Sequence, residues 1–302
     1  MNQASSANPL VLIRIPAFNH EKYIERCLRS ISADPYPNKL VVVWDDGSKD
    51  ETPRIAEVLC SELGYCFRRN SVNRGLSATL NLINSEFALA RPSFYFSIAS
   101  DDEIVPGGLD SAVRALLAQP QAGGIYARAV MIDQDGRQLG EMPCDGATGE
   151  LFFKVMYGEV RLPVQWFLWR KEVVERVGPF DPEVAMEDLY FFCKAARITQ
   201  VAFSDHLWVR YRLHGTNTTR NRWHTYVHTV RLFDQYRSEP FYAELMLRQS
   251  INLWLLLAES HRREARRYFH GAATRFWDKR FLAGLLYFLG LGRLVRAVLR
   301  KN

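Results

Sequence analysis

Two pairs of adjacent aspartates follow apolar runs in the first third of the chain. Asp45 and Asp46 come directly after VVVW, and Asp101 and Asp102 follow SFYFSIA after a single serine. Isolated charges are costly to bury, so carboxylates at a strand end indicate contact with water, a cation or a polar ligand. Mg²⁺ or Mn²⁺ held by such carboxylates usually bridges to phosphate oxygens. The two pairs favour a site for a cation and a phosphate compound, and solvated acidic turns are the alternative.

A third acidic pair and a histidine lie further along the chain. Glu187 and Asp188 begin a predicted helix over 186–197, where adjacent side chains point about 100° apart. A helix N-terminus favours an ionised carboxylate, which suits a general base, although such a pair also stabilises a helix without any catalytic role. His214 follows a predicted strand over 201–213 and is either a metal ligand or a structural residue.

The elements that must position these residues alternate regularly in the first hundred residues. We place the end of the first strand at Pro16. A helix follows this strand and starts from Asn19, whose side chain can cap it. Alternation of this kind predicts a parallel sheet with helices on both faces and ligands beyond the carboxyl ends of its strands. Three polar loops, PAFNHE, WDDGSKDE and SDDE, leave strands there. The predicted strands cover 10–15, 39–44, 66–68 and 93–99, and later helices cover 52–63 and 76–90.

For the later part of the chain, the sequence predicts a region of both strands and helices, followed by a region of helices alone. We place a domain boundary near Asn221, between a domain over 1–221, whose two halves cover about 9–105 and 106–221, and a helical region over 222–302. The expected elements are a helix over 109–117, a hairpin of 124–132 with 138–142, and a strand over 164–169, with helices from about 225.

Seven ordered motifs resemble those of the inverting family 2 nucleotide-sugar glycosyltransferases. They are PAFNHEKYIERCLRSI, VVVWDDGSKDET, NRGLSATLN, SIASDDEIVPGGL, VGPFD, MEDLYFF and YRLHGTN, and they cover about residues 9–220. The resemblance implies an α/β fold of the GT-A type. In that fold a Rossmann-like, mostly parallel sheet is flanked by helices, and here an α-helical C-terminal extension is expected.

The resemblance also implies that residues 9–105 form the donor-binding half of the catalytic domain and residues 106–221 the acceptor half, and it implies roles in binding the donor. Asp46 matches the acid that bonds the base, and a carboxylate accepts from the N3–H that uracil and thymine both offer. Phe18 matches the aromatic position beside the base, with a place in the core as the alternative. Pro16 and Ala17 match backbone contacts to the nucleoside, and Arg74, near Asn73 and Gly75, is expected to reach the base or a phosphate.

A divalent cation, Mn²⁺ or Mg²⁺, is implied at the second aspartate pair. Asp102 matches the last acid of the metal motif, and Asp101 matches an acid that meets the ribose or the metal indirectly. The form S-D-D-E leaves open whether Asp101 or Glu103 shares the metal. His214 falls where some members supply a further ligand.

The implied reaction is metal-dependent, hexosyltransferase-type transfer with inversion. Asp188 matches the general base, while Glu187 and Trp166 are expected beside the acceptor. The donor is then a UDP- or dTDP-sugar, and the acceptor is a glycan or lipid-linked glycan of bacterial surface polysaccharide biosynthesis. A carbohydrate-binding or nucleotide-sugar-binding protein without transferase activity is the alternative. A nucleotidyltransferase or dehydrogenase is disfavoured, because neither a glycine-rich triphosphate loop nor G-x-G-x-x-G follows the first strand.

Charge is concentrated at the C-terminus. The net charge is +6, yet residues 261–302 contain eleven Lys or Arg and only two acids, Glu264 and Asp278. A basic amphipathic segment over 269–301 indicates an anionic membrane surface, and a packing or dimerising helix, as in a homo-oligomer, is the alternative. No nucleic-acid-binding module is recognisable. With five cysteines, no secretory signal and no span of roughly 20 apolar residues, we expect a cytoplasmic protein, peripheral to the inner face of the membrane.

Overall fold

The computed structural model describes residues 8–215, 217 and 221–295, which form two compact units. The first unit comprises the chain up to residue 153 together with 160–214, and the second comprises 154–159 and the chain from 215 onward. The two-part division of the chain at 221 stays a prediction of the sequence.

The first unit is built on one mixed sheet, whose strand order is β3-β2-β1-β4-β8-β6-β9-β5, with β7 paired to β6. The four N-terminal strands β1 to β4 run parallel, whereas β8 is antiparallel to both β4 and β6. The expected hairpin is confirmed by β6 and β7, and β6 also pairs in parallel with β9. The strands are β1 (Val11–Ala17), β2 (Lys39–Asp45), β3 (Cys66–Arg69), β4 (Phe94–Ser97), β5 (Glu103–Ile104), β6 (Ala122–Ile132), β7 (Gln138–Glu141), β8 (Phe167–Arg170) and β9 (Gln200–Arg212).

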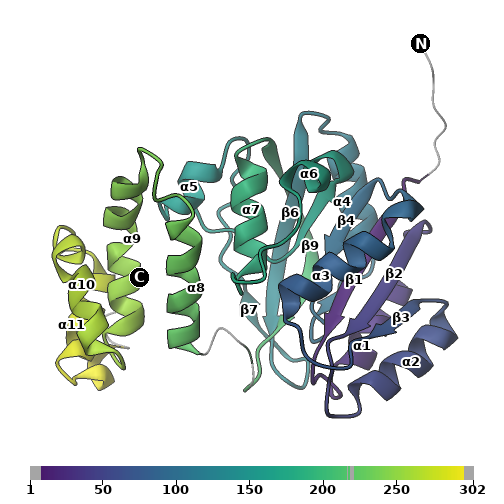
Figure 1. Cartoon of the computed structure of the whole chain (residues 1–302), viewed down its shortest axis with the longest axis horizontal. Helices are drawn as coiled ribbons and strands as arrows, with labels where there is room; N and C mark the ends of the chain where they lie inside the picture. Colours follow the sequence, from purple (N-terminus) through teal and green to yellow (C-terminus); the bar gives the residue numbers. More distant parts are fainter. Residues whose placement is uncertain (1–7, 216, 218–220, 296–302) are drawn as a thin grey trace. The chain divides into compact units, whose positions relative to one another are not determined.

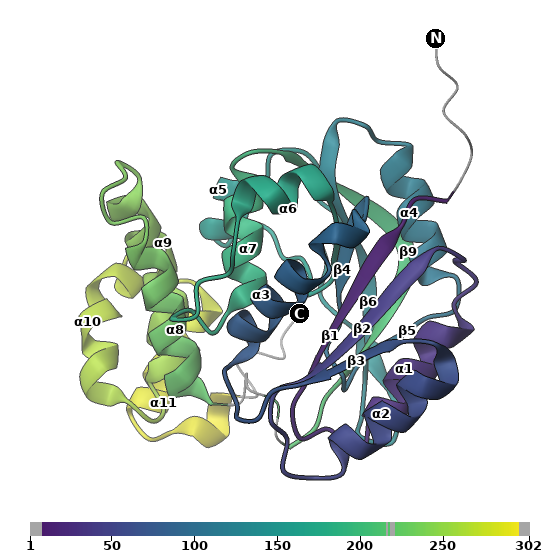
Figure 2. The ribbon, with the colours of Figure 1, turned by 45° about the vertical axis from the view of Figure 1, so that its right-hand side comes forward.

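Helices cover both faces of this sheet (Figures 1 and 2). Side chains of β1 alternate between the faces: Ile13 and Ile15 pack in a core with Leu28 of α1, whereas Arg14 donates to Asn84 of α3 at 2.9 Å. Helices α1 (Ile24–Ala33), α2 (Thr52–Leu63) and α4 (Gly108–Leu117) lie on the first of these faces, and α3 (Leu76–Glu86), α6 (Lys171–Val177) and α7 (Glu187–Ala196) lie on the second.

Two local expectations at the end of β1 were wrong. The strand continues through Pro16 to Ala17, which is tolerated because β4 pairs with β1 only as far as Arg14 and needs no N–H from the proline. Asn19 does not cap the next helix, since α1 begins after Tyr23 without a side-chain cap. Instead, Asn19 has a left-handed φ of 53° and its side chain accepts from the N–H of Lys49.

The second unit is helical, as the sequence predicts. Its helices pack around a buried Trp254 and Leu257. None of the described helices combines the length and the apolar character that crossing a bilayer requires. The helices are α8 (Arg222–Asp234), α9 (Tyr242–Leu257), α10 (Arg262–Ala273) and α11 (Lys279–Phe288), followed by a 3₁₀ turn over Gly292–Leu294. The short helix α5 (Phe152–Met156) crosses from one unit to the other, and a second 3₁₀ turn, Ala88–Ala90, follows α3.

Candidate active site

Side chains join the loops that follow β1 and β2. The backbone N–H of Asn19 donates to Ser48 Oγ at 2.9 Å, and the N–H of Lys49 donates to Asn19 Oδ1 at 2.9 Å. One residue further on, the N–H of His20 donates to Thr52 Oγ1 at 2.7 Å. The parallel pairing of β1 with β2 brings these loops to the same edge of the sheet, and the hydrogen bonds then fix them to each other.

Asp45 and Asp46 are both buried and hold different parts of the second loop. Asp45 Oδ1 accepts from the backbone N–H groups of Gly47 and Ser48 at 3.2 and 3.1 Å, which closes the tight turn. Gly47 has φ +77°, and an added Cβ would lie 2.7 Å from the backbone of Val72, so the turn requires glycine.

Asp46 organises the segment that leads into α3. Its Oδ1 accepts from the backbone N–H of Arg74 at 2.9 Å and from Asn70 Nδ2 at 2.7 Å, while Oδ2 accepts from the N–H of Gly75 at 2.8 Å. A carboxylate offers about four acceptor positions, so these three bonds leave room for one further donor.

The other expected donor-site residues lie around this carboxylate. The N–H of Asp46 donates to the carbonyl of Ala17 at 2.8 Å, which joins the ends of β1 and β2. Phe18, the next residue, is 41% exposed, so the structure does not bury it in the core. The Arg74 side chain is exposed, and Pro16 is only partly covered. A planar ligand can therefore reach Phe18 and Arg74 from solvent.

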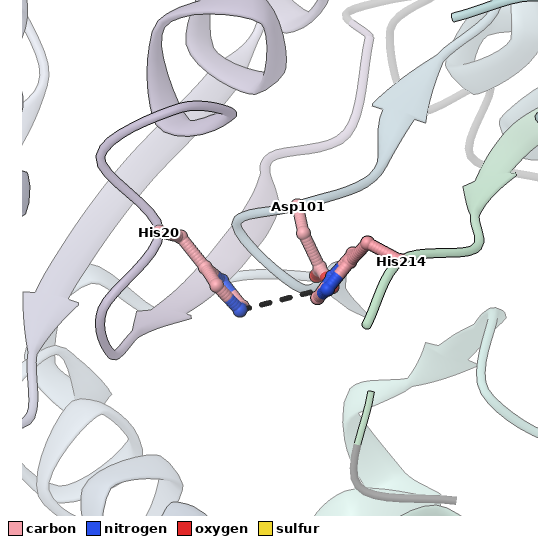
Figure 3. Close-up of side chains that lie close together, drawn as sticks. All are labelled: His20, Asp101 and His214. Atoms are coloured by element: carbon pink, nitrogen blue, oxygen red, sulfur yellow. Dashed lines mark hydrogen bonds and ion pairs between the residues drawn. The ribbon is translucent and has the colours of Figure 1, made fainter. Parts of the chain in front are cut away.

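The loop after β4 brings Asp101 between two histidines (Figure 3). His214 Nε2 lies 2.8 Å from Asp101 Oδ2, and His20 Nε2 lies 3.8 Å from the same oxygen. One ligand atom from each of the three residues lies within 4.8 Å of the others. Among the described residues, this cluster meets the geometric requirement for a protein metal site.

Asp102 faces a different set of partners from Asp101. Its Oδ1 accepts from the backbone N–H of Arg212 at 2.9 Å. The Arg212 guanidinium is fully buried: it donates to the carbonyl of Asp101 and forms an ion pair with Glu103. Glu103 is therefore engaged by arginine, and His214 is brought together with Asp101 rather than with Asp102. Trp166 is only 3% exposed, so it presents little surface to an acceptor.

The two aspartates also differ in protonation. Burial acts to raise the pKa of Asp101, but the hydrogen bond from His214 and the nearby His20 hold that pKa below its ordinary value. Burial and the Asp101 charge together raise the pKa of Asp102 well above its ordinary value. Burial lowers the pKa of His20, which favours its neutral imidazole. The ionised carboxylate of the pair is thus the one beside the histidines.

Glu187 and Asp188 lie in the first turn of α7, both partly buried. Burial and the Asp188 charge raise the pKa of Glu187 to about 8, and burial also raises the pKa of Asp188. Two neighbouring carboxylates whose pKa values are both raised are typical of a general acid or base site. The N–H of Leu189 donates to Asp188 Oδ1 at 2.6 Å.

Helix α3 holds the segment that precedes α7. Ser77 Oγ donates to the carbonyl of Val184 at 3.2 Å, and Asn81 forms two hydrogen bonds with the backbone of Phe180. Asp46 accepts from the backbone N–H of Gly75 at the start of the same helix. Helix α3 therefore contacts both the Asp46 carboxylate and the segment that leads to Asp188.

Sequence reasoning missed two contributors to this site. The motif comparison assigns no role to His20 of PAFNHE, although a histidine in a polar loop after a strand is itself a signal of a ligand site. Nothing in the sequence indicates that Arg212 belongs to the site, because its burial between Asp101 and Glu103 depends on strand β9 returning to this edge of the sheet.

The curled mixed sheet, the flanking helices and the C-terminal helices are those of GT-A glycosyltransferases, as comparison with solved structures shows. The chain matches Staphylococcus aureus TarS residues 1–349 in complex with UDP-GlcNAc, with a TM-score of 0.60, 17% identity and coverage of 96% of this chain and 91% of that one. It also matches the mannosyltransferase PcManGT of Pyrobaculum calidifontis in complex with GDP-Man and Mn²⁺, with a TM-score of 0.59, 18% identity and coverage of 98% and 88%. At these identities the likeness concerns the fold.

The chain belongs to glycosyl transferase family 2, whose model matches residues 13–178. A relative described as an uncharacterized glycosyltransferase of Rickettsia prowazekii is 25% identical over 225 residues, which is 70% of this chain and 66% of that protein. Chondroitin synthase of Escherichia coli is 28% identical over 131 residues, 43% of this chain and 19% of the synthase. The chain therefore spans slightly less than two thirds of the Rickettsia relative.

Proposed function

We propose that this chain is an inverting glycosyltransferase that moves a sugar from a UDP- or dTDP-sugar to a hydroxyl of a glycan acceptor. The observation that carries the proposal is the cluster of His20, Asp101 and His214, which the loops after β1, β4 and β9 bring together beside the loop that follows β2. Ligands of α/β folds bind beyond the carboxyl ends of such strands. The family supports the reaction class, and TarS and PcManGT are named as complexes with nucleotide-sugars.

In this proposal the nucleoside binds the two joined loops. Phe18 stacks on the base, and Pro16 and Ala17 contact the nucleoside through their backbone. Asp46 uses its remaining acceptor position for the N3–H of the base, and the exposed Arg74 reaches the base or a phosphate. The geometry supports these roles because the carboxylate and the exposed side chains belong to segments that are hydrogen-bonded to one another.

The residues at the second aspartate pair fit a divalent cation, because an ionised carboxylate and imidazole nitrogen atoms lie within one coordination sphere of each other. We propose that Asp101 and His214 would hold the cation, and that Asp102, whose carboxylate also accepts from the Arg212 N–H, would be a further ligand. When bound, the cation supplies the positive charge that stabilises the diphosphate leaving group.

Asp188 is the general base of the proposed reaction. It takes the proton from the acceptor hydroxyl, whose oxygen forms a bond to the anomeric carbon as the bond to the diphosphate breaks. The nucleoside diphosphate leaves from the opposite side, so an α-linked donor gives a β-linked product. Burial raises the pKa of Asp188, which supports this role because a higher pKa makes the carboxylate a stronger base. In this proposal Glu187 lies beside the acceptor, whereas the buried Trp166 acts through its side-chain hydrogen bond with Asp102.

The acceptor is proposed to be lipid-linked, in bacterial surface polysaccharide biosynthesis, with the protein peripheral to the inner face of the cytoplasmic membrane. The second unit exposes Phe276 at 69% and Trp277 at 72% between α10 and α11, beside the basic residues Arg275 and Lys279. Aromatic rings and cations together favour an anionic bilayer interface. Part of the basic segment, including Arg296, Val298, Leu299, Arg300 and Lys301, lies outside the described residues.

A thermal-shift screen of nucleotide-sugars with Mn²⁺ tests the proposal. A donor at 100 times its dissociation constant stabilises the folded chain by about 2.7 kcal/mol, whereas the matching sugar without a nucleotide does not. The stabilising donor is then incubated with glycan and lipid-linked glycan acceptors. Transfer with inversion is the expected result. Donor binding without transfer or hydrolysis would favour a nucleotide-sugar-binding protein, and no binding of any donor would contradict the proposal.

A further inference from the structure

His20 reaches the acidic pair from the side opposite His214 (Figure 3). The two imidazole rings are 5.8 Å apart between centroids and nearly perpendicular, with an interplanar angle of 81°. Both direct Nε2 toward the same oxygen, Asp101 Oδ2, at 3.8 Å from His20 and 2.8 Å from His214. Three ligand atoms from three separate loops therefore surround one small volume.

The His20 ring is held in this orientation by groups that do not belong to the cluster. Its Nδ1 lies 2.8 Å from Oγ of Ser100, which is fully buried, and its backbone N–H donates to Thr52. A ring whose Nδ1 is engaged in a hydrogen bond presents Nε2 to a metal, and such orienting bonds are typical of metal-bound histidines.

The three side chains also differ in their access to solvent. The His214 side chain is 3% exposed and that of Asp101 is 9% exposed, whereas His20 is 21% exposed. A cation that enters the cluster thus meets His20 at the open side. Three protein ligands leave further coordination positions free, as expected for a site that must also accept phosphate oxygens.

We propose that His20 is a further protein ligand of the cation, beside Asp101 and His214, and makes the site prefer Mn²⁺ and other first-row transition-metal ions to Mg²⁺. Two imidazoles and one carboxylate suit transition-metal ions, whereas Mg²⁺ prefers oxygen ligands and retains much of its water. The inference rests on the proposed cation site of the transferase. It is tested by metal binding alone, so a failure of the His20 assignment can be distinguished from a failure of sugar transfer.

Binding of Mn²⁺ to the full chain, measured by the electron paramagnetic resonance signal of the free ion, tests this inference. The wild type is expected to bind Mn²⁺ at least about tenfold more tightly than Mg²⁺, determined by competition. His20→Ala should lose about tenfold or more in Mn²⁺ affinity and little in Mg²⁺ affinity. His206→Ala, at an exposed histidine of β9, is the matched control and should bind both ions as the wild type does.

Ser100→Ala is a second variant, because it leaves all three ligands in place and removes only the bond that orients His20. It should weaken Mn²⁺ binding less than His20→Ala does. Circular dichroism without metal verifies that each variant is folded, and His20→Asn replaces His20→Ala if that variant is not. Equal affinity for Mn²⁺ and Mg²⁺ in the wild type, unchanged Mn²⁺ binding in the folded His20 variant, or equal losses for both ions would overturn the inference.

Discussion

Asn81 forms a reciprocal pair of hydrogen bonds with the backbone of Phe180: the Phe180 N–H donates to Asn81 Oδ1 at 2.8 Å, and Asn81 Nδ2 donates to the Phe180 carbonyl at 2.9 Å. The two residues are 99 positions apart in the chain. Together with the bond from Ser77 to Val184, this pair fixes the segment before α7 onto α3. The start of α3 in turn binds Asp46 through the N–H of Gly75.

Removing the Asn81 amide should therefore loosen the segment that positions Asp188. Asn81→Ala leaves the Phe180 N–H and carbonyl without their partner, at a cost of about 1–3 kcal/mol in the free energy of unfolding. Urea denaturation measures this loss. Ser85→Ala, at an exposed serine of the same helix, serves as the control and should change stability by less than about 0.5 kcal/mol. Equal stability of the two variants would mean that the Asn81 pair contributes nothing.

Asp188→Asn should abolish most of the transfer while keeping donor binding. The amide cannot accept the hydroxyl proton, so the turnover rate should fall at least about 100-fold. Donor affinity, followed by thermal shift, should stay at the wild-type level because Asp188 is proposed to act on the acceptor. Glu172→Gln, at an exposed acid of α6, is a matched charge-neutral control. Near-wild-type turnover by Asp188→Asn would show that Asp188 is not the general base.

The stability of the protein should fall as the pH rises. The pKa of Glu187 is about 8 in the folded chain and 4.5 as a reference value, so the unfolded chain releases its proton first. The contribution of Glu187 to the free energy of unfolding is fully present below about pH 4.5 and is lost as the pH rises toward 8. Denaturation series between pH 5 and 8 should show this slope in the wild type and a smaller one in Glu187→Gln. Identical slopes would contradict the raised pKa.

The two aspartates after β4 should differ in their effect on cation binding. Asp101→Asn replaces the ionised carboxylate between the histidines, and Mn²⁺ affinity should fall by about tenfold or more. Asp102→Asn retains an oxygen that can accept from the Arg212 N–H, so it should cost less Mn²⁺ affinity. Isothermal calorimetry with Mn²⁺ compares the two variants. A larger loss in Asp102→Asn would make Asp102 the principal ligand, as the sequence motif predicts.

Membrane binding should depend on the exposed aromatic pair of the second unit. The double change Phe276→Ser and Trp277→Ser removes the two rings and leaves the fold, because both side chains are mainly in solvent. Co-sedimentation with anionic vesicles should decrease at least severalfold relative to the wild type. Val58→Ser, at an exposed valine of α2, is the control. Equal pelleting of all three proteins would rule out insertion of these rings.

Much of the fold follows from local sequence patterns. The strands near Val41–Val43 and Phe94–Phe96 are short apolar runs, and Thr52, Pro53 and Gly64 delimit α2 because their backbone preferences suit the two ends of a helix. The end of β1 was less predictable. Whether a proline can lie in a strand depends on how far the neighbouring strand extends, and that is a tertiary property.

The sequence by itself determined which chemical groups leave the sheet at its carboxyl edge, because each motif directly follows a strand. The tertiary structure alone decided which of them meet. Asp101 and Asp102 are adjacent in sequence, yet only Asp101 lies against His214, 113 residues away, while Asp102 accepts from the Arg212 backbone. Likewise, His20 meets Ser100 and Asp101 only because the loop after β1 lies beside the loop after β4. Local preferences set where a loop begins, whereas long-range strand pairing sets which side chain of a pair faces a partner.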